Sequence, residues 1–596
     1  MVSEEYKRVV IIGAGPAGLT AAYKLAENNL PPVVLEQRDK VGGLARTETY
    51  KGNYFDMGGH RFYTKSRAVS KFWQEILTDD FLLRPRLSRI YYRNKFFNYP
   101  LKYTNALAGL GVWQAILIVL SYLKWQLFPY NREDSFEQWV TNRFGRRLYE
   151  IFFKTYTEKI WGIPCTELKA EWAAQRIKDL TLRTALTNMF IKPDDPIKTL
   201  IEEFNYPRLG PGMLWERVSN EIEKRDGIIS LNSPVTKIHC NGNRIESVAI
   251  SRNGREETIY GTDFISSMPL VELIQKLDSV PENVLQAANK LNYRDFITVC
   301  LIANKPHLFP DNWIYIHSPG VKVGRIQNFK NWSLDMVSDP SKTSLGLEYF
   351  CTEGDELWET PDDQLIELGK KELEQIGLAK YTDFEDGCVF RVQKAYPVYD
   401  SDYHDYLSTI INFINGLENF QTIGRNGLHR YNNQDHSMIT GMLAVRNLVF
   451  MEKNDLWNVN VEQEYQEEIG EEELLNPDVN EQVTGMLVRV FTRIDPIAFG
   501  LALGIVLGVL LFMLTIFLVM KGGDIVGPNL QLLSQFFPGY QVNLPGSIIG
   551  FFYVFVIGFI IGSGSAYLRN LVVYLTAVII HKDIEIHVLE NFLDYL

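Results

Sequence analysis

The sequence is poor in residues that bind metals or form disulfides. Of its 596 residues, only 5 are cysteine and 9 are histidine. The cysteines are odd in number and include no CxxC pair, which is typical of reduced thiols and not of a disulfide framework. No group of His, Cys and carboxylate residues has the spacing of metal ligands. We therefore interpret Asp402 with His404, and Asp435 with His436, as surface or cofactor-shell residues and expect no metal centre.

An excess of positive charge is also missing. Lys and Arg number 60 against 72 Asp and Glu, which gives a formal net charge of −12. Because proteins bind the phosphate backbone through clustered Lys and Arg, this balance argues against a nucleic-acid partner. The N-terminus lacks the layout of a signal peptide, since a glycine-rich turn interrupts its short apolar run. Hydrophobic residues make up 46% of the chain, which excludes a disordered protein.

Two long apolar runs lie near the C-terminus. Residues 497–520 contain no charged residue, and at about 1.5 Å per residue they exceed the roughly 30 Å core of a bilayer. A second run covers about residues 544–567. A buried helix of a soluble protein rarely stays apolar on all its faces over such a length. We predict a transmembrane hairpin and a cytoplasmic tail over residues 496–596, so that the lipid bilayer is a partner.

The orientation of this hairpin follows from its flanking charges. Arg489 and Arg493 precede the first run, Arg569 and Lys582 follow the second, and the loop between them carries only Lys521. Flanks rich in Lys and Arg stay on the cytoplasmic side. We expect a two-span membrane protein whose catalytic body and C-terminus are cytoplasmic.

Two further segments differ from their surroundings. Residues 461–475 gather many carboxylates and are interpreted as a solvated helix and linker without a catalytic role. Residues 110–128 contain a central apolar run that is too short to span a bilayer. One interpretation is a buried helix of an inserted domain. The other is a helix whose apolar side lies in the headgroup region of the membrane.

A nucleotide-binding βαβ unit opens the chain. A predicted strand at residues 8–12 is followed by Gly13, Gly15, Ala17 and Gly18, a predicted helix, and a second strand at 32–35 that ends in Glu36. The first glycine makes the tight turn, the second admits a pyrophosphate, and the third lets helix and strand pack. Free N–H groups at the helix start face the phosphates, and Glu36 is placed to bind a ribose hydroxyl.

The next segments favour FAD over NAD. Gln37 follows the acidic residue Glu36. A pair of adjacent glycines that ends in Gly43 comes soon after, and Leu44 follows it. A DMGGH segment then contains Gly58, Gly59 and His60. This layout is that of FAD enzymes related to amine oxidases.

Four longer motifs carry a family resemblance. They are GGHRFYTKS at 58–66, NYPL at 98–101, YTEKIWG at 156–162 and GRNGLHRYNNQDHSM at 424–438. With them the sequence resembles the UDP-galactopyranose mutase family, within the wider amine-oxidase and protoporphyrinogen-oxidase-like flavoproteins. The resemblance covers most of residues 1–450 and none of the apolar hairpin.

The resemblance implies an α/β fold whose Rossmann-type FAD-binding domain carries inserted substrate domains. We expect this FAD domain to be discontinuous, over residues 1–75, 205–275 and 385–455. The expected insertions are a mainly helical substrate domain at 76–204 and a sheet-containing one at 276–384. An acidic linker at 456–495 leads to the two-helix transmembrane hairpin.

The resemblance also implies a chemistry. Members of the family bind reduced FAD and interconvert the pyranose and furanose forms of a nucleotide-linked galactose, with flavin N5 as the nucleophile. The cofactor then carries the covalent chemistry, so no Ser/His/Asp system need be present. NAD(P)H is a candidate external reductant, and the substrate is a nucleotide-diphosphate sugar.

Further roles are implied residue by residue. Arg176, Arg325 and Arg425 match the arginines that face the diphosphate, a task that suits the bidentate guanidinium. The tyrosines that complete this clamp in the family are matched by Tyr315, Tyr396 and Tyr431. Trp161 matches an aromatic residue near the nucleotide and sugar, and His60 matches a histidine beside the flavin. Asn433 is placed to reach the substrate. The remaining expected cofactor contacts are Gly424, Gln434, Asp435, His436 and Ser437.

The hairpin leaves three hypotheses open. A membrane-anchored mutase would stand beside the membrane glycosyltransferases of cell-surface polysaccharide biosynthesis. An FAD-dependent oxidoreductase or desaturase would act on a membrane-resident or lipid-linked substrate. A catalytically inactive flavoprotein scaffold would have no need of its cofactor glycines, and these are intact.

Overall fold

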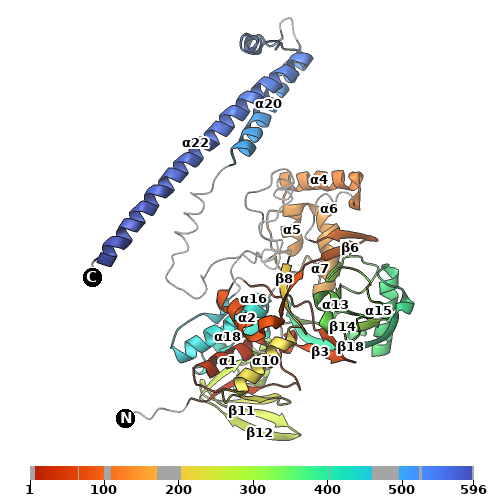
Figure 1. Ribbon diagram of the computed structural model, residues 1–596, viewed down its shortest axis with the longest axis vertical. Helices are drawn as coiled ribbons and strands as arrows, with labels where there is room; N and C mark the ends of the chain where they lie inside the picture. The colour runs from red at the N-terminus through yellow and green to blue at the C-terminus, as the bar shows by residue number, and fades with distance from the viewer. Residues whose placement is uncertain are drawn as a thin grey trace. The chain divides into compact units, whose positions relative to one another are not determined.

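The chain folds into two units, Met1–Glu472 and Glu473–Leu596 (Figure 1). Within them, the computed structural model describes residues 7–64, 66–99, 109–170, 203–400, 402–459, 495–522 and 526–593. Arg176, and almost all of the segment expected as an acidic linker, lie outside the described residues.

A five-stranded parallel sheet forms the nucleotide-binding part of the first unit. Its strand order is β19 (Phe420–Thr422), β13 (Asp263–Ser266), β1 (Val9–Ile12), β2 (Val33–Leu35) and β9 (Ile228–Ser230). The helices that pack here are α1 (Pro16–Glu27), α10 (Gly212–Glu223) and α18 (Gln434–Val449). The predicted α/β fold is confirmed, and β1 and β2 each begin one residue later than predicted.

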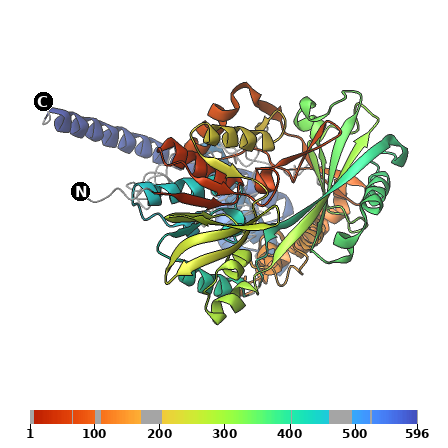
Figure 2. The same ribbon diagram turned by 90° about the horizontal axis from the view of Figure 1, so that it is seen from below.

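A seven-stranded mixed sheet forms the second half of this unit. Its order is β18 (Phe384–Pro397), β14 (Tyr293–Ala303), β17 (Thr343–Cys351), β16 (Arg325–Asn328), β15 (Trp313–Ile316), β6 (Ser88–Tyr92) and β7 (Lys95–Asn98). Only β15 and β6 run parallel to each other. In Figure 2 this sheet lies to the right and the nucleotide-binding elements lie to the left. Strands β6 and β7 come from a segment expected to be mainly helical, because pairing with β15 recruits them.

The helical insertion follows β7 in the chain. It contains α4 (Val112–Leu127), α5 (Phe136–Phe144), α6 (Arg146–Leu148), a π-helical turn (Tyr149–Lys154) and α7 (Thr155–Trp161). A capping box between Ser135 and Gln138 begins α5. Only one side of α4 is buried, so the interpretation of residues 110–128 as a buried helix is wrong for its other side.

The remaining elements complete the first unit. The helices are α2 (Arg67–Leu77), α11 (Leu270–Lys276), α12 (Glu282–Ala288), α13 (Phe329–Trp332), α14 (Glu356–Glu359), α15 (Asp362–Gln375), α16 (Tyr403–Ile414) and α17 (Gly424–Gly427). The strands are β3 (Thr47–Tyr50), β4 (Asn53–Asp56), β5 (Phe81–Pro85), β8 (Glu203–Pro207), β10 (Val235–Asn241), β11 (Arg244–Arg252) and β12 (Arg255–Tyr260).

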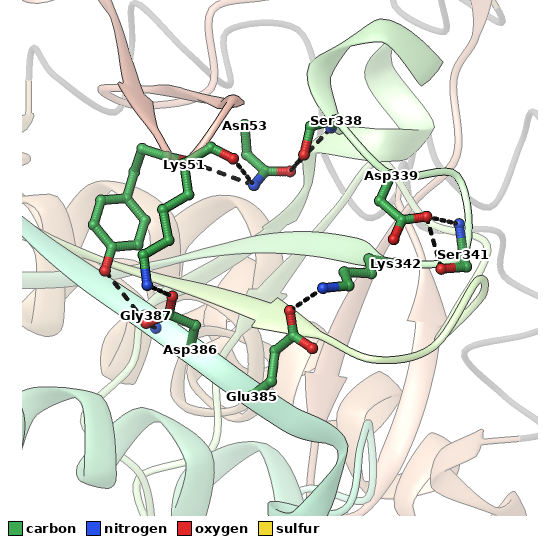
Figure 3. A network of polar contacts seen from close by, with 10 residues as sticks. Lys51, Asn53, Ser338, Asp339, Ser341, Lys342, Glu385, Asp386 and Gly387 are labelled. Atoms are coloured by element: carbon green, nitrogen blue, oxygen red, sulfur yellow. Dashed lines mark hydrogen bonds and ion pairs between the residues drawn. The ribbon is translucent and has the colours of Figure 1, made fainter.

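A polar network ties the β3–β4 ribbon to the large sheet (Figure 3). Lys51 pairs with Asp386 on β18, and the Ser338 N–H donates to the Asn53 side chain at 3.1 Å. The ribbon leads directly into the Gly58–Gly59–His60 segment. The network therefore holds the ribbon that precedes this segment against the seven-stranded sheet.

The second unit contains two long helices, α20 (Pro496–Lys521) and α22 (Leu544–Leu593), with a short α21 (Pro528–Gln531) between them. Residues Pro496–Lys521 and Leu544–Leu571 are both long and apolar enough to cross a membrane. Gly500, Gly504 and Gly508 are buried where α20 packs on α22. Helix α22 continues past the second apolar run, through residues expected to form a cytoplasmic tail.

Candidate cofactor and substrate site

The turn between β1 and α1 is built for close packing. Gly13 has φ +101°, a left-handed conformation that suits glycine. A Cβ on Gly18 would lie 2.0 Å from the Gly13 carbonyl oxygen, so only glycine lets α1 start this close to the turn. Gly15 is the N-cap and Pro16 the first residue of α1. The free N–H groups of this helix start, with their partial positive charge, suit a pyrophosphate.

Glu36 is buried at the end of β2 and holds the turn together. One carboxylate oxygen accepts the Ala14 N–H at 2.8 Å, and the other accepts the Arg38 N–H at 3.0 Å. Carboxylate oxygens have further lone pairs for hydroxyl donors. Glu36 therefore both stiffens the turn and is placed to accept from a ribose.

The second glycine pair closes over the first turn. The Gly42 N–H donates to the Ala14 carbonyl at 2.8 Å. A Cβ on Gly43, which has φ +54°, would lie 2.9 Å from the Gly15 Cα. The two loops thus approach each other through glycine residues of both, Gly15 and Gly43, beside the space where a pyrophosphate would lie.

The N-terminus of α18 forms the opposite wall. Its N-cap, Asn433, is joined to His436 in a capping box. Gln434 accepts a hydrogen bond from the Trp215 indole N–H at 3.0 Å. A Cβ on Gly424 would lie 2.9 Å from the Ala17 Cβ, so the last motif packs directly on α1. This helix start places partial positive charge at the cavity.

One cavity of about 370 Å³ joins these parts. It reaches from the carboxyl ends of β1 and β2 to side chains of the seven-stranded sheet, and ligands of open α/β sheets bind at such strand ends. The predicted residues in its wall are Gly13, Gly15, Ala17, Glu36, Gln37, Gly43, Leu44, Gly58, Gly59, His60, Tyr315, Arg325, Tyr396, Gly424, Arg425, Tyr431, Asn433, Gln434, Asp435 and Ser437.

His60 is a buried, uncharged histidine in this wall. Its Nε2 lies 2.8 Å from the Met57 carbonyl oxygen, to which it donates when that nitrogen is protonated. Burial, together with the nearby positive charges of Arg425 and Arg325, lowers the pKa of His60 to about 4. The ring is therefore neutral near pH 7 and does not repel the two arginines.

Arg325 and Glu348 form a buried ion pair. The Arg325 Nε lies 2.9 Å from each Glu348 carboxylate oxygen, and Gln327 donates to the same carboxylate. Glu348 is completely buried, and it keeps the pKa of Arg325 well above its usual range despite burial. The charge that Arg325 offers to a ligand is thus partly neutralised.

Arg425 is held differently. Its Nε donates to the Asn432 carbonyl at 2.7 Å and its Nη1 to the Ala395 carbonyl at 2.9 Å. The guanidinium lies over the Tyr431 ring at 4.7 Å from the centroid. In the described part of the chain no carboxylate pairs with it. Arg425 therefore presents an oriented positive charge in the cavity wall.

Aromatic rings surround this arginine. The rings of Tyr396 and Tyr431 stack at 5.5 Å with an interplanar angle of 14°. Trp161 lies behind them, 6.2 and 6.1 Å from these two rings, and only 1% of it is exposed. Tyr315 stands edge-on to Tyr156 at 5.5 Å. The tyrosines form the wall, while Trp161 packs as their core support.

Of the predicted residues that the structure describes, Trp161, Gly18 and His436 lie outside the wall. Gly18 acts through packing, and His436 through the cap of α18. The wall also contains residues that the sequence reasoning missed, among them Arg61, Tyr63, Trp73, Ser267 and Lys394. Arg61 and Tyr63 belong to the GGHRFYTKS motif that contains His60, and this was the available signal. Ser267 and Lys394 carried no comparable signal.

Comparisons with known proteins place these features among flavoproteins. The chain matches the family of flavin containing amine oxidoreductases over residues 16–422. It is similar to L-amino-acid oxidase of Crotalus adamanteus, with 48% identity over 66 residues, 11% of this chain and 13% of that protein. It is also similar to chloroplastic/chromoplastic 15-cis-phytoene desaturase of an Oncidium hybrid cultivar, with 24% identity over 393 residues, 62% of this chain and 64% of that protein.

The match spans less than two thirds of the length of either relative. Among solved structures, a reduced UDP-galactopyranose mutase aligns with a TM-score of 0.66 and 20% identity, over 77% of this chain and 98% of that one. At this identity the likeness establishes the fold of the first unit and leaves its activity to be argued from the site.

Proposed function

The chain belongs to the flavin containing amine oxidoreductase family, and we propose that within it this protein is a membrane-anchored, FAD-dependent mutase. It interconverts the pyranose and furanose forms of a nucleotide-diphosphate hexose of the UDP-galactose type. The observation that carries the proposal is Arg425, held by two backbone carbonyls over Tyr431 in the wall of the cavity that begins at the dinucleotide turn.

The residues present fit FAD. The close approach of Gly15 and Gly43, the carboxylate of Glu36 and the start of α18 suit a pyrophosphate, a ribose and an electron-rich flavin edge, respectively. When bound in its reduced form, FAD supplies the nucleophile for the sugar. The protein's task is then to hold and orient the substrate.

The wall residues divide this task. Arg425, with a smaller contribution from Arg325, binds the diphosphate and stabilises the negative charge that grows on it as it leaves. Tyr396 and Tyr431 orient the sugar and the nucleotide, and the neutral His60 leaves the binding of the anion to the arginines. Asn433 is the proposed hydroxyl contact. The arginines in the cavity wall, Arg325 and Arg425 among them, repel a protonated amine, which disfavours an amine substrate.

The proposal is tested by incubating the full chain with UDP-galactopyranose under anaerobic conditions and separating the products by chromatography. UDP-galactofuranose should form after reduction with dithionite or NAD(P)H and not with the oxidised protein. Equal activity in both states would overturn the mutase reading. A flavin spectrum that no sugar nucleotide perturbs would instead support the inactive scaffold.

A second candidate is an FAD-dependent oxidoreductase acting on a membrane-resident or lipid-linked substrate. Two observations favour it: the two apolar helices of the second unit and the similarity to a phytoene desaturase over much of the first. Its test is the stoichiometric reduction of the bound flavin by a lipid extract in the absence of oxygen. Arg425 argues for a phosphate-bearing lipid if this candidate holds.

The location follows from the charges that flank the hairpin. We place unit 1 and both chain ends in the cytoplasm, with the loop between α20 and α22 on the opposite side. Furanosyl donors would then be released next to membrane glycosyltransferases.

A further inference from the structure

Helix α4 carries an apolar face that the rest of the described chain leaves uncovered. Trp113, Ile116, Leu120, Leu123 and Leu127 recur at spacings of three and four residues and therefore share one side of the helix. All five are exposed, Trp113 to 70% and Leu127 to 74%. We call this side the outer face of α4. The opposite side packs into a small core through Ile118 and Tyr122.

The outer face is held rigidly. A Cβ on Gly145 would lie 2.8 Å from backbone atoms of Tyr122, so α4 touches the turn before α6 directly. The Arg147 guanidinium donates twice to the Gln114 side chain, at 3.1 and 2.8 Å. A frayed helix would not keep these contacts. The exposed apolar side chains are thus a stable feature of the folded body.

The chain around this helix is basic. Between Asp80 and Glu133 the sequence contains 8 Lys and Arg residues and no Asp or Glu, although the whole protein has a net charge of −12. Arg93 and Lys95 are exposed in the β6–β7 turn, and Lys95 donates to the Gly109 carbonyl just before α4 at 2.6 Å. Lys124 and Arg132 are exposed at the other end of the helix. Positive charge therefore lies near both ends of the outer face.

We infer that the outer face of α4 docks onto the headgroup region of an anionic bilayer. An apolar stripe of tryptophan, isoleucine and leucine beside Lys and Arg has the composition of a helix that lies in the membrane interface. A second copy of the same surface would bring its positive charges against identical ones, which disfavours self-association. The inference rests on the proposed membrane hairpin, because that anchor keeps unit 1 beside a bilayer at high effective concentration.

Docking would also orient the site. The core beneath α4 includes Phe97 and Phe152, and Tyr315 of the cavity wall packs against the same core. A bilayer bound at the outer face therefore contacts a helix that is one layer of side chains away from the cavity wall. Unit 1 would then be held in one orientation relative to the membrane. The hairpin alone, as a tether, would leave unit 1 free to rotate.

The test uses the full chain reconstituted in vesicles of phosphatidylcholine and phosphatidylglycerol whose acyl chains are brominated. Leu120→Cys carries an environment-sensitive dye, and Glu256→Cys, on exposed β12 of the same unit, is the matched control. Cys240 and Cys388 are replaced by serine, since the other three cysteines are buried. Circular dichroism confirms that each variant is folded.

Docking predicts that the dye at position 120 loses about half or more of its fluorescence to the brominated lipid, because an interfacial helix lies within reach of the upper acyl chain. The dye at 256 should lose little. Adding Leu123→Glu, or raising the salt concentration, should weaken the quenching at 120. Equal quenching at 120 and 256 would overturn the inference. Quenching at position 120 that depends on the protein density in the vesicles and not on bromine would also overturn the inference. It would show that a second copy of the protein covers the outer face. Activity is not measured, so the outcome is independent of the proposed reaction.

Discussion

Arg325 on β16 and Glu348 on β17 are direct cross-strand partners, and their side chains form a buried two-oxygen ion pair. The sequence resemblance implies a clamp of three arginines, and in the structure two of them, Arg325 and Arg425, have different partners. Arg325 is balanced by a carboxylate, whereas backbone carbonyls hold Arg425 without neutralising it. Most of the positive charge available to a diphosphate should therefore come from Arg425.

Removing the carboxylate partner of Arg325 should destabilise the folded protein. Glu348→Gln leaves a buried guanidinium without its counter-charge, and we expect the free energy of unfolding to fall by about 3–5 kcal/mol. Thermal unfolding in detergent measures the loss. UDP should restore more stability to the variant than to the wild type, because the freed Arg325 can bind phosphate. Glu452→Gln, which breaks the solvent-screened pair with Arg446, should lower the free energy of unfolding far less. Equal losses in the two variants would contradict this account.

Arg425 should dominate nucleotide binding. Arg425→Gln removes the charge, and we expect UDP to bind about tenfold or more weakly, equivalent to at least about 1.4 kcal/mol. Arg425→Lys keeps the charge but loses the planar contact with Tyr431, so it should fall between the wild type and the glutamine variant. Titration of the flavin spectrum gives the dissociation constants. Arg446→Gln is the control, because Arg446 pairs with Glu452 outside the cavity. An unchanged affinity in Arg425→Gln would remove Arg425 from the clamp.

Local features of the fold were predictable from sequence, and pairings over long distances were not. The turn at Gly13 and the strands beside it depend on near neighbours, so motif spacing found them to within a residue. The recruitment of β6 and β7 to β15 depends on tertiary packing, which no local pattern records. The same holds for Glu348, whose opposition to Arg325 follows from strand register. In α4 the apolar run predicted a helix that is either buried or interfacial, but not which of its residues would remain uncovered.

Asp56 should make the stability of the body depend on pH. Its carboxyl is fully buried, the hydroxyls of Thr47 and Tyr206 donate to it, and burial raises its pKa to about 7. The unfolded chain has an ordinary aspartate pKa near 3.9. Between these values the folded state binds more protons than the unfolded state. Stability contributed by the protonated acid is therefore complete below about pH 4 and is lost as the pH rises to about 7.

The contribution of Asp56 to the free energy of unfolding should fall by up to about 4 kcal/mol between about pH 4 and pH 7, with no further change above pH 7. Asp56→Asn has no proton to lose and should flatten the pH dependence by that amount. Denaturant unfolding of the full chain between pH 4 and 8.5 measures both profiles. Asp363→Asn, at an exposed position in the first turn of α15, is the matched control and should keep the wild-type slope. A wild-type slope in Asp56→Asn would show that another group titrates.

The hairpin should expose its loop on the side of the membrane opposite to unit 1. Four basic residues, Arg489, Arg493, Arg569 and Lys582, flank the outer ends of the apolar runs, against Lys521 alone at the loop, and such an imbalance keeps the richer side in the cytoplasm. With Cys240 and Cys388 replaced by serine, Gln535→Cys in the loop should react with a membrane-impermeant maleimide in intact cells. Glu256→Cys on β12 should react only after permeabilisation. The reverse pattern would place the cavity and its nucleotide substrate outside the cytoplasm, where a supply of reduced nicotinamide could not sustain the proposed reduced flavin.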